Sequence, residues 1–149
     1  MPAHDQLTTF LLAVHAAATW FMVGLIWFVQ LVHYPLFTHV HGEAWRAYHR
    51  RHTARTTLVV GVAMPVELFA TVWLVSLQPG AASLAGAVLL AIAWACTFFV
   101  QVPLHARLAG LDDPHTRMRL IEMLVRTNWV RTAAWSVRGG LALWMLSPA

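Results

Sequence analysis

The longest apolar run in this chain is LTTFLLAVHAAATWFMVGLIWFVQLVHYPLF, which extends from Leu7 to Phe37. At about 1.5 Å of rise per residue, a helix of this length exceeds the ~30 Å hydrocarbon layer of a bilayer. Pro35 is expected to mark its end, as Pro103 is for the run over residues 84–104, because the residue before a proline disfavours the helical conformation. The run therefore predicts a membrane-spanning helix that tilts or protrudes from the bilayer.

Three further apolar runs follow, over residues 56–77, 84–104 and 127–146. Charged residues make up only 11% of the chain and hydrophobic residues 59%, whereas a soluble domain carries about 25% charged residues. With so few charges the chain cannot cover a water-facing surface. We therefore expect an all-α integral membrane four-helix bundle, built as a single domain from residues 1–149. Its expected partners are the lipid bilayer and a lipophilic small molecule, with no nucleic acid.

A polar segment, Thr38–Arg55, separates the first two runs. Within it, the spacing of Trp45, Tyr48, His49 and His52 is typical of an amphipathic helix that lies along a membrane surface. The segment therefore predicts a short interfacial helix between the first two spans.

Arginine placement predicts the orientation, since all ten basic residues are arginine. The first connection carries four arginines and the third carries three, whereas the second, Gln78–Ser83, carries none. Basic connections stay in the cytoplasm. We therefore expect a multi-pass protein of the bacterial cytoplasmic (inner) membrane with both termini outside; a homo-oligomer is left open.

The ends of the first and third runs resemble each other. Residues 30–36 read QLVHYPL and residues 101–105 read QVPLH, and each is followed by an arginine-bearing stretch and another run. Two parallel halves of two helices each would explain this, as in some transporters. Chance similarity between two apolar helices explains it equally well.

Polar residues lie inside the apolar runs, where each costs several kcal/mol unless it meets a partner or a wet cavity. On a helix, His15, Gln30 and His33 share one face, which should point into the bundle. His15 and His33 are about 27 Å apart along that helix, so they belong to different sites. We treat His15, Gln30 and Gln101 as candidate cofactor contacts, although hydrogen bonding between helices explains such a stripe equally well.

Four histidines are expected near the cytoplasmic end: His33, His49, His52 and His105. His49 and His52 are three residues apart and therefore adjacent on one helix face. Imidazoles are the commonest metal ligands, and helical bundles bind metals through side chains of facing helices. The four histidines predict a site for a transition metal (iron or copper) or for haem. The alternative is that they contact only headgroups and neighbouring arginines.

Glu67 lies near the middle of the second run, and Arg131 and Arg138 lie in the fourth at depths that bracket it. An ion pair with either arginine would relieve the cost of both charges, and protonation of Glu67 is the other solution. Such a carboxylate serves either as a structural ion pair or as part of a reactive site.

These motifs resemble those of a group of uncharacterised bacterial four-span membrane proteins, and they cover most of the chain. They are WFVQLVHYPL (27–36), YHRRH (48–52), Glu67, QVPLH (101–105), TNWVRT (127–132) and WSVR (135–138). That group in turn resembles the anthrone-oxygenase-like membrane proteins, which share four spans and an asparagine near the start of the last one. The resemblance implies an oxygenase-type activity with Asn128 among the catalytic residues.

A weaker similarity is to the haem-containing membrane protoporphyrinogen oxidase. The residues that carry it are His15, Trp20-Phe21 and Gly24-Leu25, while Gln30 stands where that family has an arginine. This similarity implies haem binding.

Together these patterns favour a membrane-embedded redox enzyme that acts on a lipophilic aromatic or quinone-like molecule at a histidine-rich metal or haem site. In this hypothesis Glu67 relays a proton, while Arg131 and Arg138 hold an anionic or carbonyl group. The alternative is a small transporter or accessory membrane subunit in which the same three residues form a proton or anion path without a cofactor. No glycine-rich phosphate loop or nucleophile elbow occurs, which disfavours nucleotide and hydrolytic chemistry.

Overall fold

A computed structural model describes the backbone of residues 3–147 and the side chains of residues 6–147. Every regular element in that part of the chain is helical. The elements are α1 (Ala3–Phe28), the π-helical turn η1 (Val29–His33), α2 (Tyr34–Leu36), the 3-10 turn η2 (Phe37–His39), α3 (Ala44–Leu77), α4 (Ala81–Cys96), the π-helical turn η3 (Thr97–Gln101), α5 (Val102–Ala109) and α6 (Pro114–Leu146).

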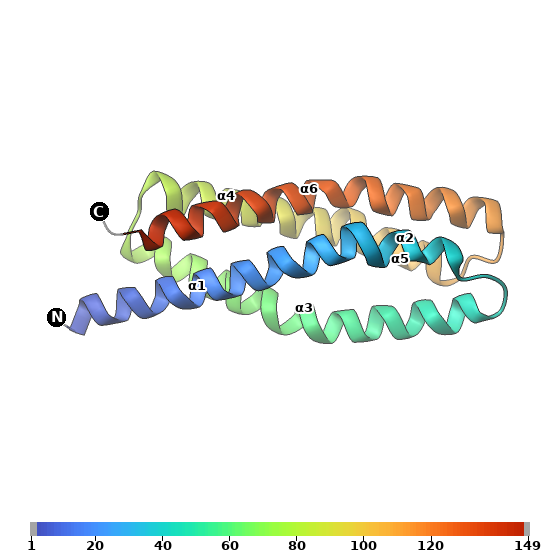
Figure 1. The fold of residues 1–149 in the computed structure, drawn as a ribbon, viewed down its shortest axis with the longest axis horizontal. Coiled ribbons are helices and arrows are strands. Elements are labelled where there is room, and N and C mark those ends of the chain that lie inside the picture. Colours follow the sequence, from blue (N-terminus) through green and yellow to red (C-terminus); the bar gives the residue numbers. More distant parts are fainter. Residues whose placement is uncertain (1–2, 148–149) are drawn as a thin grey trace.

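These elements form four long rods that run alternately up and down (Figure 1). The first rod joins α1 to η2, the second is α3, the third joins α4 to α5, and the fourth is α6. Both α3 and α6 pack against α1 and α4. The two chain ends and the α3–α4 connection lie at one end of the bundle, and the two arginine-bearing connections lie at the other (Figure 1).

Three rods are long and apolar enough to cross a membrane: Gln6–His39, Ala44–Leu77 and Ala81–Ala109. This agrees with the expected multi-pass architecture. The fourth rod, α6, is 33 residues long but less apolar, because Arg131, Arg138 and polar neighbours interrupt its second half. Residues 127–146 are therefore helical, as expected. That this helix crosses a membrane is a proposal.

The prediction of a separate interfacial helix between the first two spans is wrong. Residues 44–55 are the first turns of α3, a single helix of 34 residues. No glycine or proline stands between Ala44 and Gly61 to break the helix, so a change in polarity alone does not end it. Trp45, His49 and His52 are buried, so this end of α3 packs on the bundle.

Pro35 and Pro103 do not end their helices, contrary to expectation. Each follows a π-helical turn, Val29–His33 or Thr97–Gln101, and the chain stays helical beyond it. A proline removes one backbone donor and clashes with the carbonyl four residues earlier, and a wider π-turn accommodates that clash. The sequence echo therefore has a structural counterpart: each half of the chain has a π-turn, a proline, a short connection and a long helix.

The core alternates between apolar and polar layers. One apolar cluster fills the arginine-bearing end: Val29, Tyr34, Phe37, Trp45, Leu104, Leu108, Leu120, Ile121 and Leu124. A second fills the middle: Met22, Val23, Ile26, Met64, Ala93, Ala134 and Trp135. Buried polar side chains from all four rods lie beside and between these clusters.

Exposed contacts organise the arginine-bearing end. Asp113 caps α6 by accepting a hydrogen bond from the Thr116 backbone N–H at 2.7 Å, and this hydrogen bonding holds the pKa of the Asp113 carboxyl below its ordinary value. Next to it, Asp112 forms an ion pair with Arg46, which ties the start of α3 to the α5–α6 connection.

Candidate functional site

The first buried polar group surrounds Glu67, whose side chain is fully buried together with that of Arg138. Arg138 Nε donates to Glu67 Oε1 at 3.1 Å. Thr19 Oγ1 donates to the same oxygen at 3.1 Å, and Trp135 Nε1 donates to Oε2 at 3.0 Å. Both carboxylate oxygens therefore accept hydrogen bonds from donors on two helices, α1 and α6, which join Glu67 of α3 in one network.

The Arg138 guanidinium is satisfied on its other side as well. Its Nη1 donates to the Gly86 carbonyl, and its Nη2 lies 3.1 Å from Thr71 Oγ1 and 3.4 Å from His15 Nε2. Because arginine only donates, His15 Nε2 is the acceptor and its Nδ1 carries the proton. That Nδ1 lacks a partner, and the adjoining cavity has a volume of only about 10 Å³. We call this group the Glu67 network; it leaves no room for a substrate.

A second group links η1 to α6 through side-chain amides. Gln30 Nε2 donates to the Val125 carbonyl at 3.1 Å, and Gln30 Oε1 accepts from Asn128 Nδ2 at 2.9 Å and from Thr132 Oγ1 at 3.3 Å. Asn128 Oδ1 then accepts from Arg131 Nη1 at 3.1 Å. Each amide is oriented by the bond before it, starting from a backbone carbonyl, so this Gln30 network holds Arg131 in place.

The third group is the histidine layer, formed by His33, His49, His52 and His105. His33 Nε2 lies 2.6 Å from His52 Nδ1, and His49 Nε2 lies 3.1 Å from His105 Nδ1. The His52 and His105 rings connect the two pairs, with centroids 5.3 Å apart. The Tyr34 hydroxyl lies 3.0 Å from His105 Nε2. Three rods thus place four imidazoles in contact.

A cavity of about 550 Å³ opens beside the histidine layer, between α3 and α5. His49, His52 and His105 line it together with Tyr34, Gln101 and Arg131. Within the part of the chain whose side chains are described, five buried polar atoms have no hydrogen-bond partner. Three belong to residues of this cavity: His49 Nδ1, Gln101 Oε1 and Arg131 Nε. Most of the buried polar atoms without a hydrogen-bond partner in the described residues therefore belong to side chains of this cavity.

The structure brings the predicted site residues together in two places rather than one. His15, Glu67 and Arg138 share the Glu67 network, so Glu67 pairs with Arg138 and not with Arg131. The remaining predicted residues lie in the histidine layer, the Gln30 network or the cavity wall. They are Gln30, His33, His49, His52, Gln101, His105, Asn128 and Arg131.

The positions of the four imidazoles agree with the sequence prediction, but their donor atoms do not surround a common point. Among residues 6–147, no group of three or more histidine, cysteine, aspartate or glutamate side chains is placed to hold a metal ion as it stands. Metal or haem binding therefore stays a prediction.

Sequence reasoning missed three contributors. Tyr34 bonds His105 and lines the cavity; Thr19 and Trp135 bond the Glu67 carboxylate. The sequence signal for Tyr34 was its position between His33 and Pro35. Thr19 shares the polar face of α1, but no sequence pattern singled out Trp135 from the other seven tryptophans.

Comparisons with models of known protein families, with curated protein sequences and with solved structures found no match to this chain. The functional argument accordingly rests on the geometry of the two sites.

Proposed function

We propose that this protein is a membrane-embedded redox enzyme in which the histidine layer binds a transition-metal ion beside a lipophilic aromatic or quinone-like substrate. The observation that carries the proposal is the contact of four imidazoles, three of which line a substrate-sized cavity. Ligand pockets in proteins commonly measure about 300–1,000 Å³, and this cavity falls in that range.

The spacing of the imidazole nitrogens supports an ion. A tetrahedral ion with bonds of about 2.0–2.1 Å holds its ligand nitrogens roughly 3.3 Å apart. The His49–His105 nitrogens are 3.1 Å apart and the His33–His52 nitrogens 2.6 Å apart. We propose that on metal binding the rings rotate and exchange these two histidine–histidine hydrogen bonds for bonds to iron or copper, which imidazole suits. Tyr34 would hold the outer nitrogen of His105, as hydrogen-bonding partners of metal ligands do.

A haem fits this layer less well than an ion. The His33 and His52 rings have centroids 4.5 Å apart, and those of His49 and His105 are 5.3 Å apart. Two axial ligands need a macrocycle between them, and rings in contact leave no space for one. We therefore propose iron or copper bound directly by imidazoles.

The alternative, a transporter or accessory subunit with a proton or anion path through Glu67 and the arginines, has weaker support. Every oxygen of the Glu67 carboxylate is already bonded, and Arg138 contacts four partners. A group that relays protons or anions needs a free position for them, and the Glu67 network offers none. The same observation argues against a proton relay by Glu67 in the enzyme.

Elemental analysis of the detergent-purified protein tests the metal. We expect stoichiometric iron or copper in the wild type and much less in His52→Ala and His105→Ala. His115→Ala is the matched control, because His115 is exposed on the α5–α6 side of the same end. A wild type that stays metal-free after growth with both metals, or equal metal in all variants, would contradict the proposal.

The orientation that accompanies this function places the histidine layer toward the cytoplasm, with α6 as the fourth span in a bacterial inner membrane. Ala81 is the first residue of α4 and Ala44 the first residue of α3, and both are exposed. These two helices begin at opposite ends of the bundle (Figure 1). An impermeant thiol reagent applied to intact cells should label Ala81→Cys and not Ala44→Cys, both in a Cys96→Ala background. The opposite pattern would move the histidine layer to the outer face.

A further inference from the structure

We propose that Arg131 binds the acidic group of an aromatic anion in the cavity between α3 and α5, so that the ligand of this site is a lipophilic acid rather than a neutral molecule. The inference deepens the proposed function by naming the substrate class. It rests on the cavity and does not need the metal.

Arg131 is a buried cation without a carboxylate. It is only 7% exposed, and the two ion pairs among the described side chains, Arg46–Asp112 and Glu67–Arg138, leave it out. Its Nη1 bonds the Asn128 amide oxygen, while its Nε has no partner. A buried charge without an opposite charge is strongly unfavourable. An anionic ligand would remove that penalty.

The surroundings of Arg131 hold it ready for such a ligand. The Gln30 network fixes the Asn128 oxygen that it contacts, and the Trp135 ring lies against the guanidinium, 5.2 Å from carbon to ring centroid. Arg131 and Tyr34 both line the cavity. A guanidinium presents paired donors that match a carboxylate or a charged ring oxygen. Arg131 is therefore held from behind, and it lines the space where a ligand would lie.

The lining of the cavity indicates a lipophilic acid. The cavity wall combines imidazole faces with Val60, Val102 and Ala106, which suits a flat ring. Arg50, exposed at the rim, would attract an anion from the interface.

Paired probes test the inference with the purified protein in detergent, stripped of metal by a chelator so that no ion can bind them. 2-Hydroxy-1,4-naphthoquinone is an anion at neutral pH, and 2-methoxy-1,4-naphthoquinone is its neutral analogue. Quenching of tryptophan fluorescence reports the affinity of each. We expect the anion to bind the wild type at least roughly tenfold more tightly, as a charge-assisted hydrogen bond provides. We expect Arg131→Gln to abolish that preference.

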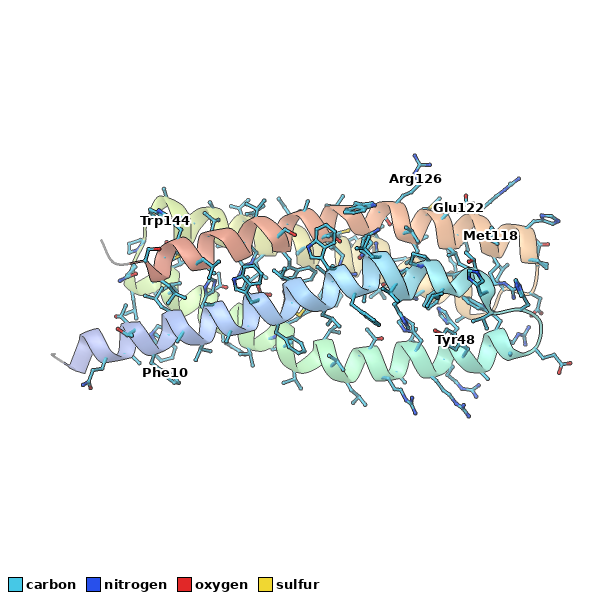
Figure 2. The ribbon with its side chains drawn as sticks, viewed as in Figure 1. Phe10, Tyr48, Met118, Glu122, Arg126 and Trp144 are labelled. Atoms are coloured by element: carbon cyan, nitrogen blue, oxygen red, sulfur yellow. The ribbon has the colours of Figure 1, made fainter. Side chains whose placement is uncertain are left out.

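Two variants locate the binding. Arg126→Gln is the matched control on the same helix, because Arg126 points away from the bundle (Figure 2), and it should keep the preference. Ala106→Trp fills the cavity and should weaken both probes, whereas binding to the exposed arginines outside it would survive.

Equal affinity of the wild type for the two probes overturns the inference, whatever Arg131→Gln does to folding. So does an anion preference that persists in Arg131→Gln or in Ala106→Trp. Metal content is measured separately on untreated protein. A metal-free protein that still prefers the anion would therefore refute the proposed metal site and leave the acid-binding site standing.

Discussion

Arg138 and Arg131 are both buried on α6, seven residues apart and so almost on the same face of the helix. Arg138 contacts a carboxylate, a backbone carbonyl, a hydroxyl and an imidazole. Arg131 contacts an amide and an aromatic ring, and its Nε has no hydrogen-bond partner. Burial of a charged side chain therefore does not by itself indicate a reactive site. A better indication is a buried charge that lacks an opposite charge and has a polar atom without a hydrogen-bond partner.

Removing the Glu67 carboxylate should have the largest effect on stability. Glu67→Gln leaves Arg138 as an uncompensated buried charge, and we expect a loss of about 3–5 kcal/mol in the free energy of unfolding. Glu67→Gln combined with Arg138→Gln should recover much of that loss, which a double-mutant cycle in thermal or denaturant unfolding would detect. Additive losses in the double variant would show that the two side chains act independently.

Gln30→Met should have an intermediate effect, because it removes the amide that orients Asn128. We expect a loss of about 1–3 kcal/mol from the buried groups left unpaired, together with a weaker anion preference at Arg131. The unfolding free energy and the two-probe binding assay are measured on the same preparation. Thr127→Val is the control: Thr127 lies on α6 next to Asn128 but accepts a hydrogen bond from Gln101 rather than from the Gln30 network. Unchanged anion binding in Gln30→Met would separate the Gln30 network from the site.

Arg131→Met sharpens the contrast with Arg138. The substitution removes a charge with no carboxylate partner, so we expect the free energy of unfolding to stay within about 1 kcal/mol of the wild type, since an apolar replacement of a buried charge is often neutral. Anion binding should nevertheless be lost. Destabilisation as large as that of Glu67→Gln would mean that Arg131, like Arg138, mainly stabilises the folded structure.

The smallest effect is expected at an exposed charge, Asp113, which serves as a reference for the two buried ones. Its pKa is held below the ordinary value by hydrogen bonding from Thr116, so its ionised form stabilises the folded state above the ordinary aspartate pKa, about 4. That stabilisation is lost as the pH falls through the lowered pKa. The melting temperature of Asp113→Ala should lie slightly below that of the wild type at neutral pH, and the gap should shrink in acid. A gap that grows in acid would contradict this assignment.

Sequence reasoning located the helices and the histidines because both depend on local patterns. Apolar runs of sufficient length gave the four rods, and alternating direction with arginine asymmetry placed His33, His49, His52 and His105 at one end. The choice between Arg131 and Arg138 as partner of Glu67 could not be made from the sequence. Both arginines bracket the depth of Glu67 and share nearly the same face of α6, so only the axial position of α6 relative to α3 decides. The link from Gln30 to Asn128 spans 98 residues, and no local pattern reports it.

The errors had a physical origin of their own. The interfacial helix was inferred from polarity, but a helix ends where its backbone is interrupted, and α3 has no interruption near residue 55. The prolines were read as terminators, yet a widened turn before each one let the helix continue. Composition shows which solvent a segment meets, whereas glycines, prolines and caps decide where it stops.

The two π-turns also determine the direction in which the side chains that follow them on the same helix point. One residue rotates a helix by about 100°, and each π-turn takes up about one residue more than a regular turn. If Val29–His33 or Thr97–Gln101 were wound as regular α-helix with all their residues kept, the downstream side chains would therefore turn by about that angle. Regular winding of the first would swing Tyr34 away from His105, and regular winding of the second would swing His105 away from His49. The histidine layer thus depends on two irregularities of winding, one in each half of the chain, and straightening either helix would dismantle it without changing any of its histidines.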